Sequence, residues 1–341
     1  MDAAVFPRDK VCAGWITPQV IAELDLDLDD YRRGRTLQPI TAFRTGLLGG
    51  YREVETAYDQ PVSYGIRRCE FDYYLLQRSR AQLCLGSPIA DIERAGDRWM
   101  VNDTVSASML VGAGGHFCPV ARLLNRRIDD APLVVAQETE FEIDRERRSS
   151  FRIDPAAPEL YFSRDLQGYG WCFRKQEYLN VGFGSLDRRL LPKATAAFIS
   201  FLKARRKIPP DASWRWRGHA YLLSDPPRRH VVDAGVLLAG DAAGLAYPQS
   251  GEGIRPAIES GLLAASTIIE ADGEYDCRRL AGYDARLRAR FGAGAVSRVL
   301  SRAVPHAVSS ALAPVLFDIP WFVRHLLLDR WFLHAHEPAL G

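Results

Sequence analysis

One carboxylate stands between an apolar run and a glycine-rich loop in residues 236–269, VLLAGDAAGLAYPQSGEGIRPAIESGLLAASTII. The apolar run ends at Gly240 and Asp241, and apolar residues return at helical spacing after the loop. Pro256 is tolerated only in a first helical turn, so the helix must begin near Gly253. The stretch predicts a buried strand, a loop and an amphipathic helix whose positive N-terminal end can hold an anionic or electron-rich ligand edge. On local chemistry alone, an ordinary strand-to-helix turn is an equal alternative.

A second glycine-rich turn follows another apolar run. Residues 107–111 (ASMLV) lead directly into Gly112, Gly114 and Gly115. The carboxyl ends of parallel strands meet at one edge of a sheet, and α/β proteins bind their ligands at that edge. We therefore expect the two glycine-rich turns to share one ligand.

The composition argues against several classes of protein. The 341 residues are 47% hydrophobic and 25% charged, as in ordinary globular proteins. The 44 basic and 42 acidic residues nearly cancel, so the charge gives no indication of nucleic-acid binding. The six cysteines form no CxxC pair, and no segment is long and apolar enough for a membrane span. We therefore expect a cytoplasmic protein with no nucleic-acid partner.

Two short clusters contain metal-ligand residue types, but neither is a complete site. His116 and Cys118 form one cluster, and His334, His336 and Glu337 form the other. A protein zinc site needs three or four ligands, and no second pair completes either cluster. We expect no metal.

The remaining elements must position the two turns. Residues 132–184 alternate apolar and polar side chains, as half-buried antiparallel strands do. The chain from Tyr283 onward is helical in pattern and is interrupted by prolines. The other predicted elements are β-structure over 37–56, helices over 71–78 and 194–206, and short strands over 82–85, 89–93, 98–102 and 214–221.

Together these elements predict an α/β chain, α+β overall, with a Rossmann-like nucleotide-binding domain, an inserted antiparallel-sheet substrate domain and a helical C-terminus. The predicted nucleotide-binding domain is discontinuous. Its segments are 1–36, 62–130 and 231–272, the substrate domain is 37–61 and 131–230, and the C-terminal helical region is 273–341.

Several motifs occur in the order typical of one protein superfamily. GDAAG at 240–244 with PQSGEGI at 248–254 resembles the second FAD-binding motif of the flavoprotein hydroxylase and geranylgeranyl reductase families. RCEFD at 68–72 and LVGAGGHFCPVAR at 110–122 resemble two further motifs, although Gly114 stands where these families usually have Asp. GYGWCF at 168–173 and FPRDKVCAG from Phe6 resemble segments of the geranylgeranyl reductases, with Arg174 where a proline often follows.

The resemblance implies roles for individual residues. Asp241 would contact the ribityl and diphosphate part of FAD, and residues 251–254 would meet the carbonyl edge of the flavin ring. Cys12 and Tyr247 are the candidate catalytic residues, although a free buried cysteine is more often simply packed. The implied cofactor-binding residues are Asp2, Arg8, Arg68, Gly112, Gly114, Gly115, Gly240, Asp241, Pro248, Gly251, Glu252, Gly253 and Ile254. The implied substrate-lining residues are Tyr169, Trp171 and Phe173, whose alternate spacing equally fits one core-facing side of a strand.

Members of these families begin with a strand, a GxGxxG turn and a helix, and this sequence shows no such start. We therefore expect that roughly 30 residues, the size of a βα unit, are absent before Met1, and that Asp2 lies at the position of the ribose-binding acid. The chain as it stands is then expected to bind FAD weakly, because the diphosphate loses one helix N-terminus.

The resemblance implies an FAD-dependent oxidoreductase that reduces carbon–carbon double bonds of a prenyl lipid or quinone, with NAD(P)H as a transient reductant. A flavin monooxygenase and an inactive remnant are the alternatives. A halogenase is disfavoured because WRWR at 214–217 lacks the WxWxIP pattern of flavin halogenases. The aromatic segment 317–334 is interpreted as a helix that closes the substrate pocket, with peripheral membrane contact as the alternative. The sequence does not indicate an oligomeric state.

Overall fold

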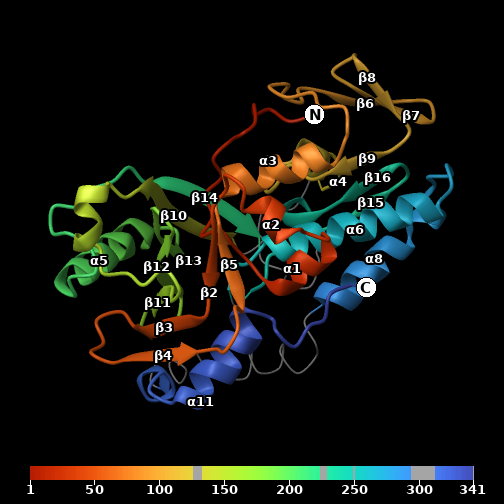
Figure 1. The fold of residues 1–341 in the computed structure, drawn as a ribbon. Helices are drawn as coiled ribbons and strands as arrows, with labels where there is room; N and C mark the ends of the chain where they lie inside the picture. The colour runs from red at the N-terminus through yellow and green to blue at the C-terminus, as the bar shows by residue number, and fades with distance from the viewer. Residues whose placement is uncertain (126–132, 223–228, 249, 293–311, 341) are drawn as a thin grey trace. The chain divides into compact units, whose positions relative to one another are not determined.

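The computed structural model describes residues 1–125, 133–222, 229–248, 250–292 and 312–340 (Figure 1). The chain forms two compact units. One, here the glycine-turn unit, comprises Met1–Arg8, Ser79–Leu133 and Tyr221–Val299, and the other, here the sheet unit, comprises Asp9–Arg78, Val134–Ala220 and Leu300–Gly341. This division groups residues 9–36 and 62–78 with the large sheet, whereas the predicted boundaries group them with the nucleotide-binding segments.

The glycine-turn unit has a three-stranded sheet in the order β15-β16-β9, in which β16 and β9 are parallel. A second small sheet, β6-β7-β8, is a meander. The elements of this unit are β6 (Ile92–Ala95), β7 (Arg98–Val101), β8 (Val105–Ala107), β9 (Leu110–Gly112), α4 (Pro119–Leu124), β15 (Val232–Asp233), β16 (Val236–Leu238), η2 (Gly240–Ala242), α6 (Ile254–Glu270), α7 (Cys277–Leu280) and α8 (Gly282–Phe291).

The predicted strand over 82–85 is wrong. No strand precedes β6 in residues 79–125 of the structure. Residues 84–87 instead exchange backbone hydrogen bonds with residues 2–4, among them Asp2 N–H to Cys84 O at 3.0 Å and Gly86 N–H to Ala4 O at 3.0 Å. The apolar residues that suggested a strand here are too few to form a regular ladder, and Leu83 stays exposed.

The sheet unit contains a seven-stranded sheet in the order β14-β10-β13-β12-β11-β3-β4, and a three-stranded sheet in the order β1-β5-β2. In the seven-stranded sheet, β10–β13, β13–β12, β12–β11 and β3–β4 pair antiparallel, and β11–β3 pairs parallel. The strands are β1 (Trp15–Ile16), β2 (Leu37–Ile40), β3 (Ala42–Leu47), β4 (Glu53–Ala57), β5 (Ser63–Ile66), β10 (Leu133–Glu142), β11 (Glu159–Phe162), β12 (Gly168–Lys175), β13 (Tyr178–Ser185) and β14 (Arg217–Leu222). The helices are α1 (Pro18–Glu23), α2 (Leu28–Tyr31), α3 (Arg68–Arg78), η1 (Arg145–Ser150), α5 (Leu191–Ala204), α11 (Pro320–Phe322) and η3 (Val323–Phe332), and residues 312–316 are also helical.

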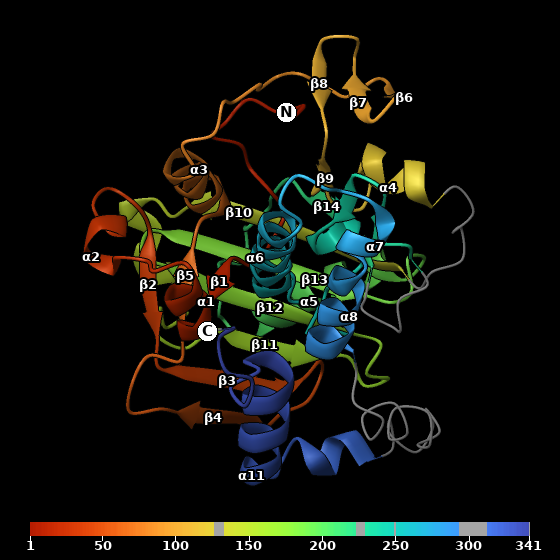
Figure 2. The ribbon, with the colours of Figure 1, turned by 90° about the vertical axis from the view of Figure 1, so that its right-hand side faces the viewer.

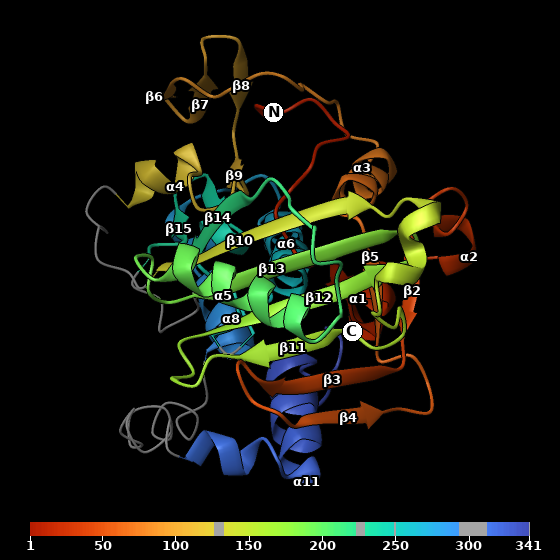
Figure 3. The same cartoon turned by 90° about the vertical axis from the view of Figure 1, so that its left-hand side faces the viewer.

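Alternation along the strands gives the seven-stranded sheet two chemically different faces. Helix α5 lies across one face, here the outer face (Figure 3), where Phe198 packs directly over Gly170. The three-stranded sheet lies against the opposite face, here the inner face (Figure 2), where Gly65 meets the ring of Phe173.

Glycine makes room for an indole on the inner face. Trp171 of β12 stands opposite Gly182 of β13, and a Cβ at position 182 would lie 2.2 Å from the Trp171 ring. No side chain other than hydrogen fits at that distance, so the tryptophan lies flat against the strand pair.

The C-terminal segment packs on the inner face. Phe332 contacts Trp15, Phe162 and Tyr169, with ring centroids 6.3, 5.7 and 5.2 Å apart. The prediction that the C-terminal region is helical is confirmed for the residues that the structure describes. None of the described helices is long and apolar enough to span a membrane.

Candidate functional site

The structure brings the two glycine-rich turns together at one edge of the β15-β16-β9 sheet. Leu238 pairs with Gly112 across the parallel strands, and Ala239 N–H donates to Gly112 O at 3.0 Å. A Cβ at Gly112 would lie 2.8 Å from Val120 Cβ, an atom that no side-chain rotation can move away, so glycine is favoured at this close approach. The strand ends that carry the two turns are therefore adjacent, as a shared ligand would require, and the shared ligand itself stays a prediction.

Asp241 lies beside the start of α6, as the sequence predicted. Gly240 has φ +58°, and its N–H donates to Ser260 Oγ at 2.9 Å, which ties the loop to the helix. Gly253 is the N-cap of α6, and a Cβ there would lie 3.1 Å from Asp241 Oδ1. Arg255 N–H donates to Glu252 Oε1 at 2.7 Å.

This arrangement fits the diphosphate and ribityl part of FAD. A carboxylate at a strand end can accept from ribityl hydroxyls, and the start of the 17-residue helix α6 places its positive dipole end beside it. The glycine at 253 leaves open the space that a side chain would fill next to Asp241.

A buried ion-pair network holds α6 in place. Glu259 accepts from Arg255 Nε at 2.6 Å and from Arg290 Nε at 2.7 Å, and both Arg255 and Glu259 are fully buried. Tyr283 of α8 donates to Leu238 O at 2.7 Å. These contacts fix the helix to the strand whose end carries Asp241.

The other predicted residues of this unit lie at several places. Tyr247 is 5% exposed and belongs to the core cluster, where it packs toward Phe291. Asp2 caps a turn by accepting from Ala4 N–H at 2.8 Å, and the Arg8 guanidinium lies over the Phe6 ring.

The remaining predicted residues belong to the two glycine-rich turns. Pro248 is exposed, the Gly251 N–H donates to Tyr247 O, and Ile254 is the first residue of α6. Gly114 lies against Cys118, Gly115 has φ +74°, and Gln249 of the predicted motif lies outside the described residues.

Cys12 and Arg68 belong to the sheet unit. Arg68 forms a two-pronged ion pair with Asp72, at 2.7 and 2.9 Å. Burial alone would lower the pKa of Arg68, but Asp72 and the Cys12 side chain raise it. The guanidinium therefore stays charged beside the Cys12 thiol.

The three predicted substrate residues share one face of β12. Tyr169, Trp171 and Phe173 all lie on the inner face, and the last two are buried. Tyr169 packs against Phe162 and Phe332, and Phe173 against Trp15. The common orientation predicted from the spacing is present, within a set of tightly packed rings.

Sequence reasoning missed a buried polar group next to these rings. We call it the Glu138 cluster, and its members are Glu138, Glu140, Trp171, Lys175 and Asn180. Lys175 is fully buried and lies 2.5 Å from Glu140 and 2.8 Å from Ile66 O. Burial raises the pKa of Glu138 to about 7, against the opposing effects of the Cys12 N–H and Lys175.

Glu140 behaves differently from its neighbour. Burial favours its neutral form, but Lys175, Asn180 and Arg67 together lower the pKa of Glu140 below its ordinary value. The sequence did contain one signal of this group. Glu138 and Glu140 are two positions apart in a predicted half-buried strand, so their carboxylates lie on the same face.

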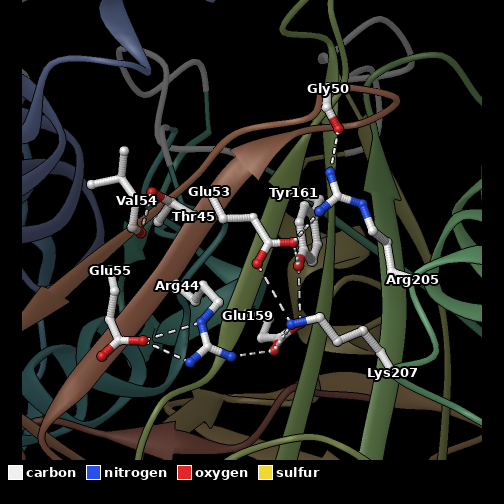
Figure 4. Close-up of polar contacts among 10 residues, drawn as sticks. All are labelled: Arg44, Thr45, Gly50, Glu53, Val54, Glu55, Glu159, Tyr161, Arg205 and Lys207. Carbon is white, nitrogen blue, oxygen red and sulfur yellow. Dashed lines mark hydrogen bonds and ion pairs between the residues drawn. The ribbon is translucent and has the colours of Figure 1, made fainter.

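A second charged group lies on the outer face (Figure 4). We call it the outer-face network, and its members are Arg44, Glu53, Glu55, Glu159, Tyr161, Arg205 and Lys207. Glu159 is fully buried and is bonded by Arg44 at 3.0 Å and Lys207 at 2.7 Å. Burial and the adjacent Glu159 and Glu53 raise the pKa of Tyr161 far above its usual value, so its hydroxyl stays protonated as a donor.

The outer side of the sheet unit also has a cavity of about 430 Å³. Its lining includes Gln137, Thr195, Ala196, Trp214 and Trp216. Because Gln137 and Trp171 lie on opposite faces of the sheet, this cavity is separate from the predicted substrate residues.

Comparisons with known proteins agree with the predicted resemblance. The chain is 24% identical to a digeranylgeranylglycerophospholipid reductase of Methanocaldococcus jannaschii over 306 residues, which cover 82% of this chain and 76% of that protein. It is 29% identical to a menaquinone reductase of Mycobacterium tuberculosis over 304 residues, which cover 80% and 70%. No protein-family model matches the chain.

The fold is that of solved flavoprotein structures. A geranylgeranyl bacteriochlorophyll reductase-like protein of Thermoplasma acidophilum matches with a TM-score of 0.75 and 21% identity, covering 92% of this chain and 82% of that one. The halogenase PltM in complex with FAD matches with a TM-score of 0.67 and 15% identity, covering 98% and 79%. The predicted fold class, the relation to geranylgeranyl reductase-type flavoproteins and the oxidoreductase class are therefore confirmed.

Proposed function

We propose that this chain is an FAD-dependent oxidoreductase that reduces carbon–carbon double bonds of a prenyl-type lipid or isoprenoid quinone. The observation that carries the proposal is the similarity to two kinds of prenyl-lipid or quinone reductase over about four-fifths of the chain. The position of Asp241 beside the start of α6 supports the choice of cofactor.

Asp241, Gly253 and the first turn of α6 would hold FAD. The cofactor supplies the two-electron redox chemistry that amino-acid side chains lack. The protein would bind the diphosphate and ribityl chain and keep water out. Of the three aromatic residues of β12, Tyr169 is the one that is not buried, and it would contact the apolar substrate chain. We propose NAD(P)H or another soluble donor as the transient source of electrons.

Titration with FAD tests the cofactor site. Asp241→Asn removes a charge-assisted acceptor, so we expect the dissociation constant for FAD to rise about tenfold. Asp97→Asn changes an exposed carboxylate of the same unit and should leave the constant unchanged. Equal affinities in all three proteins would refute the role of Asp241, and no binding in any of them would favour the inactive remnant.

An anaerobic assay tests the reaction. With reduced flavin and an isoprenoid quinone or geranylgeranyl lipid, we expect a product heavier by two hydrogens for each reduced double bond. A protein that binds FAD but yields no such product with either substrate would contradict the proposed reaction.

A flavin monooxygenase is the alternative, because a probable FAD-dependent monooxygenase of Pseudomonas aeruginosa shares the fold with a TM-score of 0.62 and 17% identity. A monooxygenase would consume oxygen and NAD(P)H when its aromatic substrate is added. Reduction that proceeds without oxygen separates the two functions.

We also propose that the C-terminal segment brings the protein to a membrane surface that contains the substrate. Large apolar side chains are exposed in residues 317–334, with Trp321 at 62% and Ile319 at 41%. Flotation with liposomes tests this, since Trp321→Ser should reduce the bound fraction if the indole enters the interface. If Trp321→Ser floats with liposomes as the unmodified protein does, the membrane role is rejected and the segment only covers the inner face.

A further inference from the structure

The backbone of Cys12 is fixed by side chains of the Glu138 cluster. Asn180 Nδ2 donates to Cys12 O at 3.2 Å, and the Cys12 N–H faces the carboxyl of Glu138. Two residues further along, Gly14 has φ +70° and accepts from Ile66 N–H at 2.8 Å. A Cβ at Gly14 would lie 2.7 Å from Lys175 Nζ, so the backbone from Cys12 to Gly14 lies against the cluster.

Asn180 cannot turn over without breaking other bonds. Its Oδ1 accepts from Trp171 Nε1 at 2.7 Å, and its Nδ2 also donates to Glu140 Oε2 at 3.1 Å. Because an indole only donates and a carboxylate only accepts, the amide has one orientation. The Cys12 carbonyl therefore has a fixed donor, whereas the acceptor for its N–H can change its charge.

The charges around Glu138 do not balance. Two charged residues face Glu138, namely Glu140 on the same strand and Lys175 on β12. Arg67 pairs with Glu140 at 3.2 Å, and it also pairs with Glu70 at 3.0 Å. Three ionised glutamates would oppose two cations, so the group is neutral only when one glutamate holds a proton. Glu138 is 5% exposed, and its Oε2 has no hydrogen-bond partner among the described residues. The proton therefore belongs on Glu138.

We propose that Glu138 is a positioning residue for residues 12–14, and that it tightens or loosens the Cys12 backbone by losing or gaining one proton. The ionised carboxyl is the stronger acceptor for the Cys12 N–H, so the segment is held more firmly when Glu138 is charged. This positioning role does not depend on the proposed function. Only its effect on catalysis rests on the proposed function.

The direction of the pH effect follows from the charge states. Burial raises the pKa of Glu138 to about 7, so the carboxyl is neutral in mildly acidic solution and charged in mildly basic solution. The Cys12 amide should therefore be better protected from hydrogen exchange above neutrality than below it.

Hydrogen exchange of the Cys12 amide tests the proposal in the purified full chain. After correction for intrinsic exchange, we expect its protection factor to rise about fivefold from about pH 6 to about pH 8. Glu138→Gln should abolish the rise. Glu142→Gln, at an exposed position of the same strand, should keep it.

The proposal is overturned if protection in the unmodified protein is flat across this range, or if Glu138→Gln retains the rise. The pH series of the unmodified protein decides the question even if the variant does not fold.

The pH dependence of turnover provides the link to catalysis. If the proposed reduction occurs, Glu138→Gln should remove a limb near pH 7 from the kcat profile, with KM little changed and Glu142→Gln unaffected. A kcat profile that keeps this limb would refute the catalytic link. A rise in protection without any reductase activity would reject the proposed function and leave the positioning role standing.

Discussion

Two charged groups lie on opposite faces of one sheet, and they differ in whether their charges balance. The outer-face network pairs three carboxylates, Glu53, Glu55 and Glu159, with three cations, Arg44, Arg205 and Lys207. The Glu138 cluster and its neighbours set three carboxylates against two cations, and one carboxyl oxygen has no partner among the described residues.

The difference separates two uses of buried charge. A balanced network such as that around Glu159 satisfies every charge it buries and fixes β3, β4, β11 and the end of α5 in place. In an unbalanced cluster with an excess carboxyl, that carboxyl becomes neutral by binding a proton. The protonation state of the cluster therefore depends on pH and on any ligand nearby. Substitutions of matched residues on the two faces should therefore have different effects.

The largest difference is expected for the two lysines. Lys175→Met leaves buried carboxylates without their main cation and should lower the free energy of unfolding by about 3–5 kcal/mol. Lys207→Met should cost about 2 kcal/mol, because Arg44 still pairs with Glu159. Urea unfolding at neutral pH measures both, and a larger cost for Lys207→Met would invert the comparison.

Replacing a glutamate by glutamine should have opposite signs on the two faces. The pKa of Glu138 in the folded chain is raised from 4.5 to about 7, so the folded state keeps a proton that the unfolded state loses between these values. The stability of the unmodified protein should fall as pH rises through that window and then stay level. Glu138→Gln removes this fall and should be the more stable protein above neutrality by about 3 kcal/mol, with no difference near pH 4.

The outer-face counterpart of that substitution is Glu159→Gln. It should destabilise by about 2 kcal/mol at neutral pH, because it weakens bonds from Arg44 and Lys207. Thermal unfolding across a pH series compares the two variants. A destabilised Glu138→Gln above neutrality would show that the cluster needs its negative charge.

Two aromatic substitutions test whether the Trp171 indole holds the Asn180 amide in place. Trp171→Phe and Tyr161→Phe each remove one buried donor and should each cost about 1 kcal/mol. Only Trp171→Phe frees the Asn180 amide, so only this variant should speed exchange at Cys12. Equal exchange in both variants would mean that Asn180 does not depend on the indole.

The smallest effect is expected at the rim of the outer-face network. Glu55 is 53% exposed and pairs with Arg44 at 2.6 Å, so Glu55→Gln should cost at most about 0.5 kcal/mol. High salt should reduce this cost further, because exposed pairs are screened. A cost that equals that of Glu159→Gln would mean that burial does not set the strength of these pairs.

Periodicity and helix-stop signals predicted much of the fold. Pro256 correctly located the start of α6, and apolar runs located β9 and β16. Both signals are local, since they depend on the conformational limits of one residue or on alternation within a few. The strand predicted over 82–85 failed because a ladder also needs a partner, and the partner is a short irregular segment at residues 2–4.

The Glu138 cluster could not be predicted from the sequence for a different reason. Lys175 and Asn180 reach Glu138 only through the register of β10, β13 and β12, in which Glu138 pairs with Gly182 and Glu140 with Asn180. Alternation gives two faces to each strand but does not say which strands become neighbours, or which face is buried. The Asp241 site was accessible because its parts follow one another along the chain.

The close contact between Gly182 and the Trp171 ring makes the residue types allowed at these two positions depend on each other. Gly182 is required only while an indole lies over it, and the indole is what orients Asn180. Among related chains, loss of the tryptophan should therefore relax position 182 to larger residues, and Asn180 should vary along with it. Covariation of these three positions would identify the relatives that retain the Glu138 cluster, independently of their overall similarity.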